Sequence, residues 1–560
     1  PWESQRYLRR GLYRKKIAMR PSRSMQRIDL CGQPFKGLRE RDMYYVDKSL
    51  LIKELLDSND RGVFLFTRPR RFGKTTNLSM LDAFFNIRYA GNPWFDDLEI
   101  SRYPEYTGYK NKFPVIHLNL NDTKANTYGS YINKLRIAVK DAYEPHRYLL
   151  EDDDLDTAVR DNFDSFARRN ISEDFLSTSI KDLSDAISRI NRRPIILIDE
   201  YDRAVTDNFG KKSQKDILDF LGDFLCSALK TNANREMAYM TGIMQIAQTS
   251  SFSGLNNVSV HNIFSEMGDE RFGFTESEVE RILKDFGHTE KMGEAKEWYD
   301  GYRFGNAEVY NPFSIMSYVS HGFKPEQYWI DSGSTSMITD LLWNVDSQNF
   351  EKVVDLVTGG RVETRLDHLF SLMALSGYLR AVPIGDGRYE TSIPNNEVRM
   401  AVENLTSSVF PVDTGYFGQF VRATIDGDAA SMEETFQDIL LHGNCLNLKE
   451  NAYEVIMMTL MHSLVKRYNV RTEHKSGFGR TDIVLEPRND GDQYRIFELK
   501  VSRSADRLES DAKEAIEQIH RERYHLGMPG EVVLYGISFY GNTLKVLIEK
   551  VHGERDDNLR

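Results

Sequence analysis

The stretch TRPRRFGKTT (67–76) carries residue types that bind phosphate groups. In a G-x-x-x-x-G-K-[ST] loop, backbone N–H groups surround the phosphates, the lysine reaches the outer phosphates and the hydroxyl holds Mg²⁺. Gly73-Lys74-Thr75 match the end of this pattern, but Arg68 stands where the first glycine belongs. Two interpretations are open, a nucleotide loop or a basic turn that imitates one. We expect nucleotide contacts from Arg70, Arg71, Phe72, Gly73, Lys74, Thr75 and Thr76.

Two adjacent carboxylates follow a second apolar run. RRPIILIDEYD places Asp199 and Glu200 directly after residues 195–198. A carboxylate at the tip of a buried strand can hold the water shell of Mg²⁺, and the next one can polarise the attacking water. We therefore expect Thr75 and Asp199 at the metal and Glu200 in a catalytic role, as in Walker A and Walker B motifs; the alternative is a solvated strand end. Thr241 ends the run MAYMTG (237–242) and could sense the terminal phosphate, although threonine at a strand end is ordinary.

A third group of chemistry-bearing residues lies near the C-terminus. Asp482 starts the run TDIVLEP, and Glu498 and Lys500 interrupt the apolar run QYRIFELKV. The period of two along a strand places Glu498 and Lys500 on one face. Two carboxylates can bind hard divalent cations, and a lysine can orient or deprotonate water or stabilise a pentavalent phosphorus. A buried structural ion pair is the alternative, but charges in an apolar strand are costly to bury without partners.

The elements around these residues follow from the apolar patterns. The continuous run 62–66 predicts a buried strand before the loop, and TTNLSMLDAFFNI has helical spacing after it. A loop between a strand and a helix N-terminus is the context that phosphate binding requires. The run PVIHLNL (114–120) predicts a further strand between the two motifs. We therefore expect an α/β P-loop NTPase domain over 28–270.

The middle and C-terminal parts have different patterns. TESEVERILKDF predicts a helix with a capping box from Thr275 to Glu278, and 271–440 is expected to form a mostly helical lid and middle region. WYDGYRFG (298–305) could bind a base or a strand, but a turn held by aromatic packing is the favoured interpretation. From 441 to 560 the pattern predicts an α/β domain in the order helix, three strands, helix, strand.

Composition limits the classes of function. The chain of 560 residues is 40% hydrophobic, which predicts several soluble domains rather than one core. The net charge of −11 excludes an overall basic coat, so any nucleic-acid surface must be local. Because no apolar run approaches the roughly 20 residues of a membrane span, we expect an intracellular, soluble, cytoplasmic protein. Residues 1–27 are rich in Lys and Arg and are expected to form a disordered arm. A nucleic-acid-binding or targeting tail is one interpretation, and a fragment or an incorrect start upstream of Met19 or Met25 is the favoured one.

Seven segments in order carry a resemblance to a known family. They are YYVDKSLLIKELL, TRPRRFGKTTNLSML, ILIDEYD, TGIMQIAQTSSFSGLNN, FGFTESEVERIL, WYDGYRFG and VYNPFSIMSYV. From about Ile28 onward the chain resembles the AAA-ATPase-like proteins with a C-terminal PD-(D/E)XK nuclease-like domain. In that family the arginine-rich loop is the usual form, so the resemblance favours the nucleotide loop over its imitation. The chain departs from the family at Gln245, where a basic residue is common, which indicates slow hydrolysis.

The resemblance also implies cofactors, partners and further site residues. It implies ATP with Mg²⁺ at the loop, and Mg²⁺ or Mn²⁺ at Asp482, Glu498 and Glu454, with Gln518 in an accessory position. AAA-like modules often assemble, so a homo-oligomer is expected, with Arg271 or Arg303 as candidates to complete a neighbour's site.

Two classes of function follow. The first is an enzyme in which ATP controls metal-dependent cleavage of nucleic acid, DNA in the first place, as in a defence or mobile-element effector. The alternative is a nucleotide-switched adaptor that binds DNA or a protein through a non-catalytic nuclease fold. The Asp482, Glu498 and Lys500 set favours the enzyme, because a binding surface does not need acids that face a phosphate backbone.

Overall fold

The computed structural model describes most of the chain. The described residues are 27–30, 32–58, 62–153, 155, 157–168, 171–208, 212–244, 257–329, 373–385, 388–401, 414–442, 453, 457, 460–461, 464, 467–476, 479–489 and 491–553. The expected basic arm up to residue 26, Gln245 and Glu454 lie outside them.

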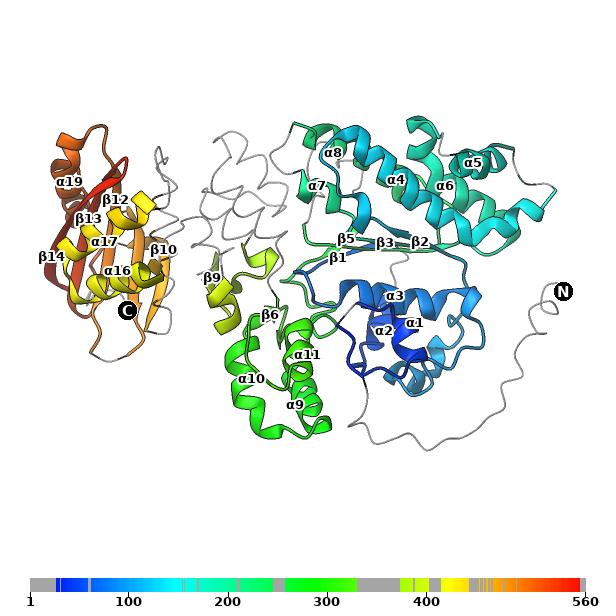
Figure 1. Ribbon diagram of the computed structural model, residues 1–560, viewed down its shortest axis with the longest axis horizontal. Helices are drawn as coiled ribbons and strands as arrows, with labels where there is room; N and C mark the ends of the chain where they lie inside the picture. The colour runs from blue at the N-terminus through cyan, green and yellow to red at the C-terminus, as the bar shows by residue number, and fades with distance from the viewer. Residues whose placement is uncertain are drawn as a thin grey trace.

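The N-terminal part is built on a five-stranded parallel sheet (Figure 1). The strand order is β2-β3-β4-β1-β5. The strands are β1 (Val63–Thr67), β2 (Val115–Asn119), β3 (Ile195–Asp199), β4 (Ala238–Gly242) and β5 (Val258–His261). Every residue of β1, β3 and β4 is buried, as the continuous apolar runs predicted. The sequence did not predict β5, because VSVH is short and half-polar.

Helices cover both faces of this sheet. Figure 1 shows α1, α2 and α3 on one side and α4 to α8 on the other. The first group is α1 (Phe35–Glu40), α2 (Leu50–Asp57) and α3 (Lys74–Phe85). The second group is α4 (Tyr128–Tyr143), α5 (Thr157–Arg168), α6 (Glu173–Ile190), α7 (Arg203–Asp207) and α8 (Gln214–Leu225). The predicted α/β P-loop architecture is therefore confirmed, with β1, the loop and α3 in the expected order.

A small helical region follows the sheet. It contains α9 (Glu276–Asp285), α10 (Met292–Tyr299), the hairpin of β6 (Tyr302–Phe304) and β7 (Ala307–Val309), and α11 (Pro312–Ser320). The predicted capping box is present, since the Thr275 side chain accepts from the Glu278 N–H and the Glu278 side chain accepts from the Thr275 N–H. Tyr44 and Val46, which precede α2, share an apolar cluster with this region.

The middle region is not only helical. A hairpin of β8 (Arg380–Gly385) and β9 (Arg388–Ser392) interrupts the stretch that sequence periodicity assigned to helices. The helices α16 (Thr414–Asp426) and α17 (Ala429–His442) follow it. They pack on the C-terminal sheet, where Phe436 of α17 lies 5.6 Å from Phe539 between ring centroids. These two helices are thus part of the C-terminal body, although the sequence placed them in the middle region.

The C-terminal part is a mixed five-stranded sheet in the order β10-β11-β12-β13-β14. The elements are β10 (Tyr468–Ser476), β11 (Gly479–Pro487), β12 (Tyr494–Val501), α19 (Leu508–Arg521), β13 (Gly530–Tyr540) and β14 (Thr543–Gly553). The strands pair antiparallel except β12 with β13, which are parallel and are joined through α19. Of the predicted helix over 452–468, the described residues 453, 457, 460 and 461 are helical and buried.

Alternation along β13 separates the two faces of the C-terminal sheet. Val532 and Leu534 pack with Ile516 and Ile519 of α19, whereas Val533 and Phe539 face the other apolar cluster. On β12, Ile496 belongs to the α19 face. Glu498 and Lys500, at even positions of the same strand, therefore lie on the α19 face as well.

Candidate active sites

The phosphate-type loop joins the C-terminal end of β1 to the N-terminus of α3. In open parallel sheets ligands bind at this edge, because the helix N-termini and the loops meet there. Gly73 has φ +80 and Arg71 has φ +66, so two residues adopt the left-handed conformation just before the helix. Glycine accepts this conformation without strain. The loop therefore turns through two left-handed residues just before α3.

Arg68 does not point to a ligand. Its side chain is fully buried, and its guanidinium donates to the carbonyl oxygens of Thr67 and His261 at 2.9 and 2.8 Å and of Gly268 at 3.4 Å. It also lies over the rings of Phe66, Phe272 and Phe304, with centroid distances of 5.9, 4.9 and 5.1 Å. Burial lowers the pKa of Arg68 to about 10. The residue that replaces the first glycine thus connects the loop with β5 and with the linker, residues 262–275, that leads to the lid formed by α9 to α11.

Lys74 lies inside the loop, close to the second carboxylate. Its ammonium donates to the carbonyl oxygens of Arg68 and Pro69 at 3.1 and 3.0 Å and is 3.7 Å from Glu200 Oε1. Glu200 has φ +53, an uncommon conformation for glutamate. Strained backbone of this kind clusters at functional sites, where the surrounding structure maintains it. The structure thus brings the Walker A lysine and the expected catalytic carboxylate together.

Asp199 and Thr241 form a buried hydrogen-bonded pair at this site. The Thr241 hydroxyl donates to Asp199 Oδ1 at 2.5 Å, and both side chains are buried. Burial and then the charge of Glu200 raise the pKa of Asp199, while contacts with the hydroxyls of Thr241 and Thr75 oppose this rise. Thr75 itself is exposed at the first turn of α3. The oxygens of Thr75 and Asp199 are hard donors of the kind that Mg²⁺ takes, so these residues fit the expected ion.

The lid and the segment beyond it pack against the loop. Phe72 is fully buried, with its ring 4.9 Å from Tyr302 and 5.0 Å from Phe304 between centroids. The Trp329 indole N–H donates to the Arg70 carbonyl at 3.1 Å, and the Arg71 guanidinium lies 3.9 Å from the centre of the Phe313 ring. Phe72, expected at the nucleotide, can therefore offer only its backbone. The aromatic motif WYDGYRFG supports the loop by packing, in agreement with the favoured interpretation.

The two arginines considered for a neighbouring subunit are engaged within the chain. Arg271 Nε donates to Glu54 Oε1 at 2.6 Å, and Glu54 Oε2 accepts from the Gly268 N–H at 2.9 Å. Arg303 Nε donates to the Gly305 carbonyl at 3.2 Å. Both side chains thus stabilise the linker and the lid of their own chain.

The C-terminal residues meet on the α19 face as expected. Asp482 lies one position beyond the Ile483–Phe497 pair, which places it across from Glu498. Asp482 Oδ2 accepts from the Leu499 N–H at 2.7 Å, Lys500 Nζ donates to Gln518 Oε1 at 2.5 Å, and the Gln518 amide donates to Glu498 Oε1. The amide of Gln518, on α19, therefore joins the acid and the lysine of the E-x-K motif.

The environment of Glu498 suits a cation. Glu498 is only 4% exposed, and its buried Oε2 has no hydrogen-bond partner among the described residues. Burial, and then the charge of Asp482, raise the pKa of Glu498 to about 8, whereas Lys500 lowers it. A cation between the two carboxylates would relieve their repulsion and use the free oxygen, so the residues fit a divalent metal. Among the described residues no group of three His, Cys, Asp or Glu forms a metal cluster.

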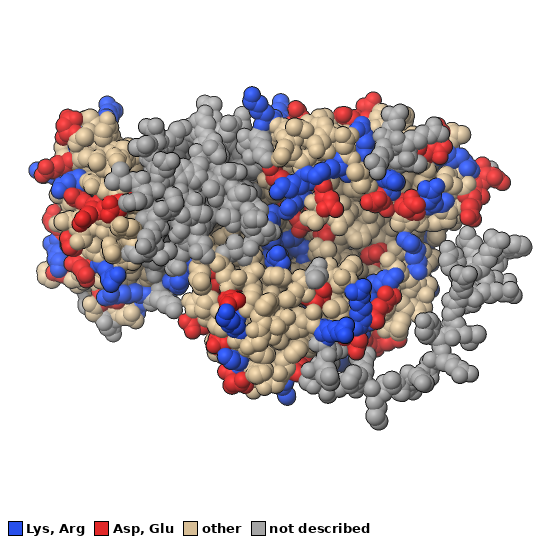
Figure 2. All heavy atoms as spheres, in the orientation of Figure 1, with Lys and Arg blue, Asp and Glu red and all other residues tan. Residues whose placement is uncertain are grey.

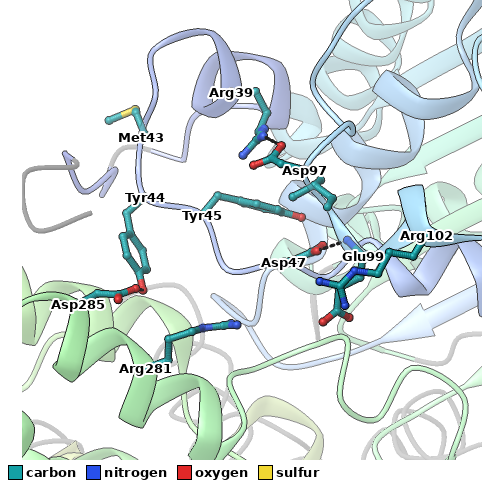
Figure 3. Close-up of a pocket in the computed structure, with 11 residues that line it drawn as sticks. Arg39, Met43, Tyr44, Tyr45, Asp47, Asp97, Glu99, Arg102, Arg281 and Asp285 are labelled. Carbon is teal, nitrogen blue, oxygen red and sulfur yellow. Dashed lines mark hydrogen bonds and ion pairs between the residues drawn. The ribbon is translucent and has the colours of Figure 1, made fainter. Parts of the chain in front are cut away.

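A polar pocket lies where the segment before α2 meets α9, and several of its groups are paired (Figure 3). Arg39 pairs with Asp97, and the Tyr44 hydroxyl donates to Asp285 Oδ2 at 2.8 Å. Asp47 accepts from the N–H groups of Ser49 and Glu99 at 2.8 and 2.7 Å. This pocket joins the ATPase-like body to the lid, and it contains none of the residues expected to do chemistry.

Charges on the visible surface are mixed. On the face in Figure 2, Lys and Arg are interspersed with Asp and Glu over the described parts. No described helix is long and apolar enough to cross a membrane.

Sequence reasoning missed residues that act through packing and backbone contacts. Asp202 accepts two backbone N–H groups beside Thr241, and Glu397 accepts the N–H groups of Tyr328 and Trp329, both at 2.7 Å. The acidic spacing of DEYD was a signal for Asp202. Nothing in the sequence around Glu397 indicates its partners, which lie some 70 residues away.

Comparisons with known proteins agree with this two-part arrangement. Residues 30–252 match the family described as Predicted AAA-ATPase, and residues 448–549 match the PD-(D/E)XK nuclease superfamily. An uncharacterised protein in the vnfD 5′ region of Azotobacter chroococcum mcd 1 is 24% identical over 510 residues, which are 85% of this chain and 90% of that protein. The Aeropyrum pernix ORC2 protein, in ADPNP–ADP complexes, is 9% identical with a TM-score of 0.29 over 76% of this chain and 85% of that chain. A TM-score this low bears no weight.

The fold and the two sites define a P-loop protein joined to a nuclease-type domain. The chain is similar to AAA-ATPase-like proteins over residues 30–252 and to the PD-(D/E)XK nuclease superfamily over residues 448–549.

Proposed function

We propose that the chain binds and hydrolyses ATP at the Lys74 site and that this controls metal-dependent cleavage of nucleic acid, DNA in the first place, at the Glu498 site. The observation that carries the proposal is the convergence of Asp482, Glu498 and Lys500 on one sheet face, with Gln518 bridging the last two. Two contacts support the nucleotide part of the proposal, because Lys74 lies 3.7 Å from Glu200 and the Thr241 hydroxyl donates to Asp199.

At the nucleotide site each residue has a separate task. Lys74 would leave the carbonyl oxygens of the loop and neutralise the outer phosphates, as phosphate-loop lysines do. Thr75 and Asp199 would hold Mg²⁺, which lowers the charge on the phosphates. Glu200, beside Lys74, would orient the attacking water, and Thr241 would report the terminal phosphate through its bond to Asp199.

At the nuclease-type site the residues would hydrolyse a phosphodiester. Asp482 and Glu498 would hold Mg²⁺ or Mn²⁺. When bound, the ion would neutralise charge on the scissile phosphate and lower the pKa of a bound water. Lys500 would orient that water toward the phosphorus or stabilise the charge on the transition state. The new bond joins the water oxygen to phosphorus and the bond to the leaving oxygen breaks. Gln518 would fix the direction of the Lys500 ammonium through its 2.5 Å hydrogen bond.

A cleavage assay tests the nuclease part. Wild type, Lys500→Ala and Lys513→Ala are incubated with plasmid and single-stranded DNA in Mg²⁺ or Mn²⁺. Lys513 is an exposed lysine on α19 and serves as the matched control. We expect a metal-dependent nick in wild type and Lys513→Ala that disappears in Lys500→Ala, while all three bind ATP equally. No nick from the wild type under any condition would remove the enzyme interpretation of this site.

One observation favours the second candidate, a nucleotide-switched adaptor. The Gln518 amide donates to Glu498 Oε1 and its oxygen accepts from Lys500 Nζ, so these three side chains partner one another without a cation. A domain that never takes up the cation would keep the Gln518 bridge and act as a binding surface. Binding of DNA that depends on ATP but needs no divalent metal, with no cleavage, would support this candidate.

A further inference from the structure

Residues 199–202, which end β3 and follow it, lie against residues 241–244, which end β4 and follow it. Thr241 Oγ1 donates to Asp199 Oδ1 at 2.5 Å, and the Tyr201 N–H donates to the Thr241 carbonyl at 3.0 Å. The Tyr201 hydroxyl donates to the Met244 carbonyl at 2.5 Å. Asp202 Oδ2 accepts from the N–H groups of Ile243 and Met244 at 2.8 and 2.6 Å. Segment 199–202 thus binds segment 241–244 along its whole length.

The hydrogen-bond partners of the Asp202 side chain are unusual for its position in the chain. It occupies the N-cap position of α7, where aspartate commonly accepts from the N–H groups of its own helix. Its side chain does not cap α7 but reaches across to the chain beyond β4. The residue is completely buried, and within the described part of the chain its second oxygen has no hydrogen-bond partner. A buried carboxylate is costly, so the two N–H groups that it holds are the contacts that stabilise it.

The same segment also touches the phosphate loop. The Gly242 carbonyl accepts from the Arg68 N–H at 3.1 Å. A Cβ atom at Gly242 would come within 2.5 Å of the Tyr201 ring and 2.8 Å of Asp202 Oδ1, so only glycine fits. Segment 241–244 is therefore held between the loop on one side and Tyr201 and Asp202 on the other. Thr241 cannot move without a change in these contacts.

We propose that Asp202 is a positioning residue for ATP hydrolysis, which holds segment 241–244 so that Thr241 and Glu200 keep their places at the terminal phosphate. The inference rests on the proposed ATPase function. Asp202 touches no reacting atom, and it acts through the backbone of Ile243 and Met244. The role predicts an effect on the hydrolytic step that is larger than the effect on nucleotide binding, because binding relies on Lys74 and the loop backbone.

The two N–H groups that donate to Asp202 Oδ2 favour the ionised form of this side chain. Burial, and then the charge of Glu200, raise the pKa of Asp202 to about 6, while the Ile243 and Met244 N–H groups and Lys74 lower it. An ionised carboxylate forms stronger hydrogen bonds with N–H groups than an amide oxygen does. Asparagine at this position would keep an acceptor oxygen and lose this strength, and alanine would lose both.

The test compares Asp202→Asn and Asp202→Ala with two control variants. Asp47→Asn and Asp47→Ala also remove a carboxylate that accepts two backbone N–H groups, but they do so in the pocket of Figure 3. Steady-state ATPase activity gives kcat and KM, and titration with a fluorescent ADP analogue gives Kd. We expect kcat to fall about 100-fold in Asp202→Ala, since displacement near 1 Å can have this effect, with Kd changed less than about 3-fold. Asp202→Asn should recover most of kcat, and the Asp47 variants should keep it.

The outcomes separate the inference from the proposed function. Wild-type protein that binds but never hydrolyses ATP would overturn the ATPase proposal, and the positioning role with it. Active wild type with an equally active Asp202→Ala would overturn the positioning role alone. A parallel loss of kcat and nucleotide binding in Asp202→Ala, unrelieved in Asp202→Asn, would also overturn it, because that result describes a residue needed only for folding.

Discussion

Restoring the usual glycine at position 68 should damage the protein rather than improve its loop. In Arg68→Gly, the carbonyl oxygens of Thr67, His261 and Gly268 lose their donor, and three aromatic rings lose the guanidinium that they surround. The cavity lies between the loop, β5 and the linker, so the loss affects the join between sheet and lid.

The magnitude follows from these contacts. The two short hydrogen bonds from the charged guanidinium contribute about 1.5 kcal/mol each, and the 3.4 Å contact adds little. Cation–ring contact adds about 1 kcal/mol, and glycine in an ordered backbone costs about 0.5–1 kcal/mol. Relief from burying the cation offsets about 1–2 kcal/mol of this sum. We therefore expect a loss of about 3 kcal/mol, which lowers the unfolding temperature of a domain this size by about 6–12 °C.

The assay is differential scanning fluorimetry, which measures the thermal unfolding transition of the N-terminal domain. Arg71→Gly is the matched control, because Arg71 is an exposed arginine of the same loop with φ +66, which glycine adopts freely. Its unfolding temperature should stay near that of the wild type. Arg68→Gly that unfolds with the wild type, or no earlier than Arg71→Gly, would refute the anchoring role of Arg68.

Three further results are expected. Lys74→Ala should abolish detectable ATP binding in a fluorescence titration, because the ammonium inside the loop is lost. Gln518→Ala should lower DNA cleavage about 10–100-fold, as is typical when a partner that orients a site residue is removed, without a change in ATP affinity. Glu397 has its pKa raised by burial from 4.5 to about 7, so the folded protein holds a proton that the unfolded chain releases first. The stability that this proton gives is complete below about pH 4.5 and is lost as the pH rises toward 7. In Glu397→Gln, the free energy of unfolding from denaturant titrations should therefore change less with pH across that range.

Buried strands and the sites at their tips were predictable from the sequence. The runs that became β1, β3 and β4 are continuously apolar, and the residues at their ends are the ones that meet around Lys74. Period-two alternation likewise placed Glu498 and Lys500 on one face of β12. These inferences depend on local periodicity and on the rule that parallel strands end at one edge, so they need no knowledge of distant contacts.

Contacts between distant segments were not predictable. The sequence indicates that Arg68 is an arginine of the loop. The three aromatic rings and two distant carbonyl groups that it contacts belong to residues as far along the chain as Phe304. Phe72 was expected at the nucleotide, but the hairpin of β6 and β7 encloses its ring. The hairpin of β8 and β9 and the strand β5 are short and have weak patterns, so tertiary pairing defines them. Glu454 and Gln245 lie outside the described residues, and their roles stay predictions.

The central claim is that ATP at one site controls cleavage at the other. The most direct measurement is cleavage of plasmid and single-stranded DNA in Mg²⁺ or Mn²⁺, with and without ATP, by wild type, Lys74→Ala and Lys500→Ala. The account predicts that cleavage by wild type depends on ATP. Cleavage by Lys74→Ala should no longer depend on ATP, and Lys500→Ala should not cleave. Cutting by wild type that is the same with and without ATP, and the same in Lys74→Ala, would contradict it.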